Sequence, residues 1–304
     1  MRGSVKSQCE HLYRVIDAIG TSKHEAKLLS RQAGAGNWHE IGKNLGIHSY
    51  STKDAYLDVW KQCLCHCREN FGIRDIEKVE NTHVQSFLHE KIGNGVKYST
   101  FKQYCAALEK LEVALNKYAA ERGTGREYRF DFSGVRQEAR ESLDRGAEAR
   151  AYDNPREIIR HIENEAHRIA ASVQLEGGAR LAEICGLGPE NLRGDGVVHL
   201  DNCKGGLERD IRVSDNTYEA LKNYVESHGR LDFDKDAYRE DIRAACQTVG
   251  EEYHGSHGFR WNFAQEAVER YQHEGYTYEE ALSKVSEDMG HHREDITKHY
   301  LRVR

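Results

Sequence analysis

The scarcity of proline is the feature that most limits what this chain can fold into. Only Pro155 and Pro189 interrupt 304 residues, while apolar residues recur every three to four positions over long stretches. That period matches the turn of an α-helix, and a run without proline lets a helix continue. The sequence therefore predicts a mainly α-helical fold, and it is long enough for two domains that each bury an apolar core.

The first third of the chain predicts a helical bundle. Residues 1–49 contain short helical patterns and are expected to form an N-terminal helical extension. Residues 50–121 carry three longer amphipathic patterns and are expected to form a helical domain. The clearest of these helices begins at a capping box made by Ser51 and Asp54 and ends at Gly72.

Residues 122–150 are rich in arginine and are interpreted as a basic linker between two domains. Such a segment could lie along a DNA backbone, and a solvated helix neutralised by neighbouring glutamates explains it equally well. The candidates for DNA contact in this segment are Arg122, Arg126, Arg129 and Arg136.

The remainder, residues 151–304, is predicted to form a second domain that is helical apart from one β-hairpin. Pro155 suits the first turn of a helix. Residues 197–203 and 208–213 flank Gly205-Gly206, a pair whose conformational freedom suits a tight turn between antiparallel strands.

Six residues of the second domain have the chemistry needed to cut a phosphodiester without a metal ion. Such a reaction needs a nucleophile that can hold the cut strand, cations that offset charge at phosphorus, and an acid for the leaving oxygen. Guanidinium groups bind phosphate oxygens and keep their charge, an ammonium group can protonate an oxygen, and a phenol becomes a nucleophile when neighbouring cations favour phenolate. The second domain has several residues of each of these types, and a family resemblance singles out six of them, in chain order Arg180, Lys204, His257, Arg260, His291 and Tyr300.

The segments around these residues resemble the motifs of the tyrosine recombinases, or phage-type integrases. The similarity is carried by Gly177-Gly178-Ala179-Arg180-Leu181-Ala182-Glu183, Lys204-Gly205-Gly206, His257-Gly258-Phe259-Arg260, and Gly290-His291 followed nine residues later by Tyr300. Two features depart from the simplest members of the family: Trp261 stands where a histidine is common, and the spacing from Arg260 to His291 includes an acidic stretch, residues 271–280, that is longer than in those members. Neither departure removes a catalytic group.

The resemblance implies a site-specific DNA recombinase that integrates, excises or rearranges mobile DNA. Tyr300 would attack the scissile phosphate to form a 3′-phosphotyrosyl link, which a 5′-hydroxyl would later reverse. Arg180, Arg260, His257 and His291 would supply the positive field around the phenol, Lys204 would protonate the leaving oxygen, and Glu183 would orient the site. No metal or other cofactor would be required.

The resemblance also implies the domain roles and the partners. Residues 50–121 would form a SAM-like core-binding domain and residues 151–304 the catalytic domain, which together would grip a duplex as a C-shaped clamp. The expected partners are double-stranded DNA with a specific recombination site and further copies of the chain, as a dimer on each site and a tetramer in synapsis. Only four residues follow Tyr300, so the way in which subunits would couple is left open.

Charge and hydropathy add two expectations. The net charge of −6 means that any affinity for DNA must come from local basic faces rather than from a basic surplus. There is no apolar run of the length that a membrane span needs, and the first ten residues lack the apolar core of a secretory signal. The protein is therefore expected to be cytoplasmic, associated with the nucleoid and not with a membrane.

Metal binding is a weaker interpretation of the cysteines and histidines. In Cys63-Leu64-Cys65-His66-Cys67 the middle cysteine of a helix points away from the other two, so the thiols are expected to be small buried groups. His254, His257, His291, His292 and His299 lack the spacing of a zinc hydrolase. The alternatives that remain are a DNA-holding protein that does not cut, a metal-dependent hydrolase and a type IB topoisomerase.

Overall fold

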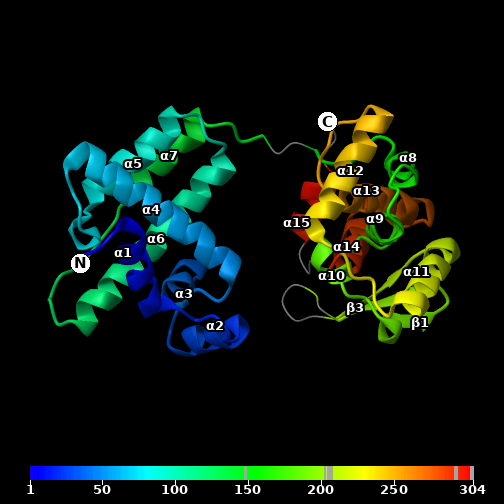
Figure 1. Ribbon diagram of the computed structural model, residues 1–304, viewed down its shortest axis with the longest axis horizontal. Helices are drawn as coiled ribbons and strands as arrows, with labels where there is room; N and C mark the ends of the chain where they lie inside the picture. Colours follow the sequence, from blue (N-terminus) through cyan, green and yellow to red (C-terminus); the bar gives the residue numbers. More distant parts are fainter. Residues whose placement is uncertain (147–148, 202, 204–207, 291–293, 302–304) are drawn as a thin grey trace. The chain divides into compact units, whose positions relative to one another are not determined.

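The computed structural model describes residues 1–146, 149–201, 203, 208–290 and 294–301. The chain forms two compact units, Met1–Gly146 and Ala147–Arg304 (Figure 1). Its fold is mainly α-helical with one small antiparallel sheet, which confirms the predicted fold class. None of the helices in the described part of the chain is both long enough and apolar enough to cross a membrane.

Unit 1 is a helical bundle built around α4, which packs against α1, α5 and α6. Its elements are α1 (Val5–Tyr13), the 3-10 turn Arg14–Ile16, α2 (Lys23–Gln32), α3 (Trp38–Asn44), α4 (Tyr50–Phe71), the 3-10 turn Ile76–Lys78, α5 (Asn81–Gly93), α6 (Tyr98–Glu121) and α7 (Ser133–Ser142). Trp60 of α4 is fully buried, and its indole N–H donates a hydrogen bond to the Ala107 carbonyl oxygen at 2.7 Å. This bond satisfies the polar end of a side chain that otherwise packs in the apolar core.

The ends of α4 show which local signals were informative. The helix begins at Tyr50, and the hydroxyl of Ser49 accepts from the Thr52 N–H, so the cap lies two residues before the predicted Ser51. Its end at Gly72 is as predicted: this residue has a φ of 67°, the left-handed conformation that glycine adopts without steric cost.

The arginine-rich segment and the N-terminal extension both pack into unit 1. The segment contributes Phe130, Phe132 and Val135 to the bundle core, and α7 packs against α5 and α6. From the N-terminal extension, Leu12 and Ile16 enter the same core. Residues 122–146 thus belong to unit 1, because the apolar residues that lie among the arginines pack into its core.

Unit 2 combines helices with a three-stranded sheet. Its elements are α8 (Pro155–Arg160), α9 (Glu165–Gly177), α10 (Leu181–Ile184), the 3-10 turn Pro189–Asn191, β1 (Leu192–Gly194), β2 (Val197–Leu200), β3 (Arg209–Arg212), α11 (Asp215–His228), α12 (Lys235–Val249), α13 (His257–His273), α14 (Tyr278–Asp288) and α15 (Glu294–Tyr300).

The sheet has the strand order β1-β2-β3, and both pairs are antiparallel. The pairing of β2 with β3, in which Val198 lies opposite Ile211, confirms the predicted hairpin strands. The hairpin turn, residues 204–207, lies outside the described residues. Strand β1 was not predicted, because a three-residue strand has too few positions to show alternation.

Helix α13 organises the part of unit 2 that holds the candidate residues. It packs against α9 on one side and α14 on another, and α15 packs against both α13 and α14. Figure 1 shows these four helices gathered in the same unit. The segments that carry Arg180, Arg260 and Tyr300 are thereby brought to one place.

Candidate active site

Tyr300 ends α15, and its hydroxyl faces the first turn of α13. The hydroxyl oxygen lies 2.9 Å from Nε2 of His257, and the side chain is 8% exposed. The Tyr300 ring also packs against Trp261, with ring centroids 5.3 Å apart. Trp261, which stands where the family commonly has a histidine, therefore contacts the candidate nucleophile.

His257 and Arg260 lie one helical turn apart on α13, so they project from the same face. Arg260 is fully buried; its Nη1 donates to the Gly178 carbonyl oxygen and its Nη2 to the Met289 carbonyl oxygen at 2.6 Å. Its guanidinium carbon lies 5.9 Å from the centroid of the Tyr300 ring. Burial, together with the charge of Arg180, lowers the pKa of Arg260 to about 10, so the group is still a cation at neutral pH.

His257 is neutral at neutral pH, whereas the sequence led us to expect that it adds positive charge. Burial, and after it the cations Arg260, Arg150 and Arg180, lower its pKa to about 4. An unprotonated imidazole nitrogen can accept the hydrogen bond from the Tyr300 hydroxyl. The pair is thus arranged for a proton to pass from the phenol to the imidazole.

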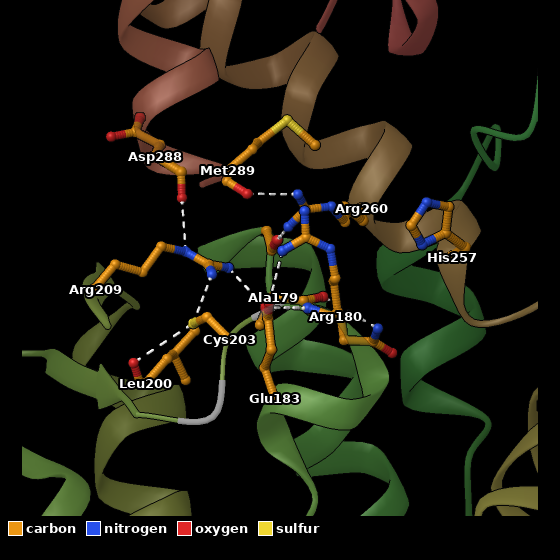
Figure 2. A network of polar contacts seen from close by, with 12 residues as sticks. Ala179, Arg180, Glu183, Leu200, Cys203, Arg209, His257, Arg260, Asp288 and Met289 are labelled. Atoms are coloured by element: carbon orange, nitrogen blue, oxygen red, sulfur yellow. Dashed lines mark hydrogen bonds and ion pairs between the residues drawn. The ribbon is translucent and has the colours of Figure 1, made fainter. Parts of the chain in front are cut away.

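Arg180 is presented at the junction of α9 and α10. Helix α9 is capped by Gly178, which has a φ of 61° and lies so close to the Phe263 ring that a β-carbon would not fit. This tight turn directs the Gly178 carbonyl to Arg260 and places Arg180 immediately before α10. Figure 2 shows Arg180, Arg260 and His257 next to one another.

Glu183 holds Arg180 from the first turn of α10. Its side chain is 1% exposed, and its Oε1 accepts from Nη1 of Arg180 at 2.6 Å. Burial alone would raise its pKa, but hydrogen bonds from the Arg209 side chain and from the backbone and side chain of Arg180 lower that pKa to about 2. Glu183 is therefore a carboxylate at neutral pH.

The structure adds one residue that the sequence did not single out. Arg209, the first residue of β3, donates to Glu183 Oε2 at 2.7 Å, to the Asp288 carbonyl oxygen at 3.0 Å and to Cys203 Sγ at 3.0 Å (Figure 2). Strand alternation is the sequence feature that could have indicated an inward-facing side chain at position 209, because Arg209 shares a sheet face with the buried Ile211 two residues later.

The remaining predicted residues are placed as follows. Lys204 and His291 lie outside the described residues. In unit 1, Arg136 forms an ion pair with Glu109 at 2.6 Å, and Arg129 is exposed. Two further linker arginines have partners in the same unit: Arg122 donates to the Tyr118 hydroxyl at 2.8 Å, and Arg126 lies 3.7 Å from Glu80.

The cysteine cluster of α4 has the geometry that helical spacing predicts. Cys63 and Cys67 are buried, and Cys65 is exposed. Within the described part of the chain, no group of three or more His, Cys, Asp or Glu side chains is arranged to hold a metal ion.

The arrangement combines a phenol, a neutral imidazole and two guanidinium groups. The guanidinium groups offer fixed positive charge for a phosphate, the phenol offers an oxygen nucleophile, and the imidazole offers a proton acceptor. These parts define a class of site suited to phosphoryl transfer to a tyrosine.

Comparison with known proteins identifies the family. Residues 151–304, just over half of the chain, match the model of the phage integrase family. The chain belongs to this family, the tyrosine recombinases. No curated protein sequence matches the chain.

Solved structures share the fold along nearly the whole chain. XerH recombinase bound to its difH substrate is similar with a TM-score of 0.62 and 15% identity, over 100% of this chain and 94% of that chain. A lambda integrase dimer bound to a COC′ core site gives a TM-score of 0.58 and 16% identity, over 92% of this chain and 93% of that one. The Tn1549 transposon integrase in complex with circular intermediate DNA gives 0.54 and 16%, over 94% and 96%.

Proposed function

We propose that the protein is a site-specific DNA recombinase that cuts and rejoins DNA through a covalent link to Tyr300. The observation that carries the proposal is the position of the Tyr300 hydroxyl, 2.9 Å from the neutral His257 and beside the buried cation Arg260. In a member of this family, a phenol held in that way is the expected nucleophile.

The chemistry follows from the groups at the site. The Tyr300 oxygen attacks phosphorus as its proton passes to His257 Nε2, and the bond from phosphorus to the 5′ oxygen breaks. The products are a 3′-phosphotyrosyl link and a 5′-hydroxyl, and a 5′-hydroxyl from another strand reverses the step. Arg180 and Arg260 offset the negative charge that develops on the phosphate oxygens.

The proton for the leaving 5′ oxygen needs a donor. We assign this role to Lys204 on the family resemblance. The proposed reaction balances without an oxidant, a nucleotide or a metal ion.

The proposed partners are a DNA duplex with a specific site and further copies of the chain. Solved relatives include a lambda integrase dimer on a core site and a lambda integrase tetramer on a Holliday junction. By analogy, we propose a dimer on each site and a tetramer in synapsis. Unit 1 would be the core-binding part, and the protein would act on mobile DNA in the cytoplasm, at the nucleoid.

The test is covalent trapping on nicked suicide duplexes made from the DNA that flanks the gene, in the presence of EDTA. The wild-type chain should form an adduct that survives denaturation, and Tyr300→Phe should form none because it lacks the nucleophilic oxygen. The matched control is Tyr278→Phe, which removes the hydroxyl of an exposed tyrosine from the same unit and should keep the adduct.

Other outcomes support the alternatives. Wild-type protein that binds these duplexes without forming an adduct indicates a DNA-holding protein. Cleavage that EDTA abolishes indicates a metal-dependent hydrolase. An enzyme that relaxes a plasmid but never joins two sites is a type IB topoisomerase.

A further inference from the structure

Arg209 connects three parts of unit 2 that are distant in the sequence. It reaches Glu183 in α10, the Asp288 carbonyl at the end of α14, and Cys203 after β2. Its side chain is only 11% exposed, so most of its hydrogen-bonding capacity is directed into the protein. Figure 2 shows the guanidinium group at the centre of this network.

We propose that Arg209 is a positioning residue: it neutralises Glu183 and thereby leaves the positive charge of Arg180 available to a DNA phosphate. The proposal rests on the proposed function, because it concerns the same phosphate. It assigns Arg209 no contact with DNA and no part in bond making.

The charge balance around Glu183 supports this role. The two carboxylate oxygens bind different guanidinium groups: Oε1 accepts from Arg180 at 2.6 Å and Oε2 from Arg209 at 2.7 Å, and Oε2 also accepts from the backbone N–H of Arg180 at 2.8 Å. One carboxylate and two guanidinium groups leave a net charge of about +1. Without Arg209, Glu183 and Arg180 would form a neutral pair, and a bidentate geometry would turn Arg180 away from the phosphate.

The other contacts of Arg209 fix its direction. Nε donates to the Asp288 carbonyl at the C-terminal end of α14, where the exposed carbonyl groups favour a cation. The next carbonyl, that of Met289, accepts from Arg260. One helix end thus orients both Arg209 and Arg260, and a lysine at position 209 has a single nitrogen that cannot reach all three of the Arg209 partners together.

The experiment measures the rate of adduct formation on the suicide duplex, in the full chain, with two forms of the scissile phosphate. One form is the ordinary phosphodiester, and the other is a methylphosphonate, in which a methyl group replaces a charged non-bridging oxygen. The variants are Arg209→Met and Arg209→Lys. The matched control is Arg212→Met, which removes an exposed guanidinium group from the same strand.

On the phosphodiester, Arg209→Met should slow adduct formation by about 30-fold relative to Arg212→Met, the loss expected for one charge-assisted contact. The rate for Arg209→Lys should lie between the rates for these two variants, because lysine keeps the positive charge but loses the several directed hydrogen bonds of the guanidinium group. On the methylphosphonate, the loss should shrink to about 3-fold or less, because there is less phosphate charge for Arg180 to hold. A loss caused only by a damaged fold would be the same on both substrates.

A second background tests the route through Glu183. In Glu183→Gln there is no carboxylate charge to neutralise, so adding Arg209→Met should cost about 3-fold or less. If thermal unfolding shows that Arg209→Met does not fold, the loss of rate on the phosphodiester is compared with the loss on the methylphosphonate in Arg209→Lys instead.

Two results overturn the proposal while the proposed function stands: a rate for Arg209→Met within twofold of Arg212→Met, or an equal loss on both phosphates. Absence of an adduct from the wild-type chain overturns the proposed function and this proposal with it. Adduct formation by the wild-type chain therefore distinguishes failure of the Arg209 proposal alone from failure of the proposed function.

Discussion

The neutral state of His257 predicts a specific loss of stability in acid. In the folded protein its pKa is about 4, because of burial and the nearby cations Arg260, Arg150 and Arg180. In the unfolded chain a histidine has a pKa of about 6.5. Between these values the unfolded chain binds a proton that the folded chain does not, so the free energy of unfolding decreases as the pH falls from about 6.5 to about 4.

The size of the effect follows from the two pKa values. The linkage relation gives a loss of about 2 kcal/mol in the free energy of unfolding between pH 7 and pH 5 from this one residue. Above about pH 7 both states are neutral at this position, and the contribution to the pH dependence vanishes.

Urea denaturation at pH 7 and at pH 5 measures this loss. Trp261 reports on unit 2 when Trp38 and Trp60, both in unit 1, are replaced by phenylalanine. In this background the chain with His257 should lose about 2 kcal/mol more than His257→Gln. The matched control is His273→Gln, which removes an exposed imidazole from the other end of α13 and keeps His257. Equal losses with and without His257 would refute the reasoning.

Two further predictions concern the backbone and the arginine-rich segment. Gly178→Ala should lower the free energy of unfolding of unit 2 by about 3 kcal/mol, because its β-carbon would meet the Phe263 ring. Gly72→Ala, also at positive φ but in open space, should lower the free energy of unfolding of unit 1 by only about 1 kcal/mol. Similar losses for the two variants in urea denaturation would contradict this reasoning. Arg136→Met should lower the free energy of unfolding of unit 1 by at most about 1 kcal/mol and weaken duplex binding by less than about twofold, because Glu109 already pairs with this arginine at 2.6 Å. A larger loss of affinity in a gel-shift titration would show that Arg136 binds DNA.

The sequence was most informative where the signal is local. The period of apolar residues and the glycine at position 72 located α4, and two glycines between strand patterns located the hairpin. The arginine-rich segment was harder, because its composition suggested a linker while Phe130 and Val135 enter the bundle core. Which surface covers such residues depends on other parts of the chain, and no short window of sequence contains that information.

The candidate site shows the same limit. Family motifs identified His257 and Tyr300 as candidates, but the motifs do not predict the distance of 2.9 Å between His257 Nε2 and the Tyr300 hydroxyl oxygen. The neutral state of His257 depends on burial and on nearby cations, and two of these, Arg150 and Arg180, come from other segments of the chain. Arg209 escaped notice because a single arginine in a strand looks like a surface residue until the buried partner Glu183 is known.

The hydrogen bond between His257 and Tyr300 joins two residues of one polypeptide. Under the proposed function, each copy therefore brings its own attacking group and its own proton acceptor to the strand that it cuts. Neither of these two groups then has to come from a neighbouring copy, so exchanging paired strands in order requires control over which copies act at a given moment.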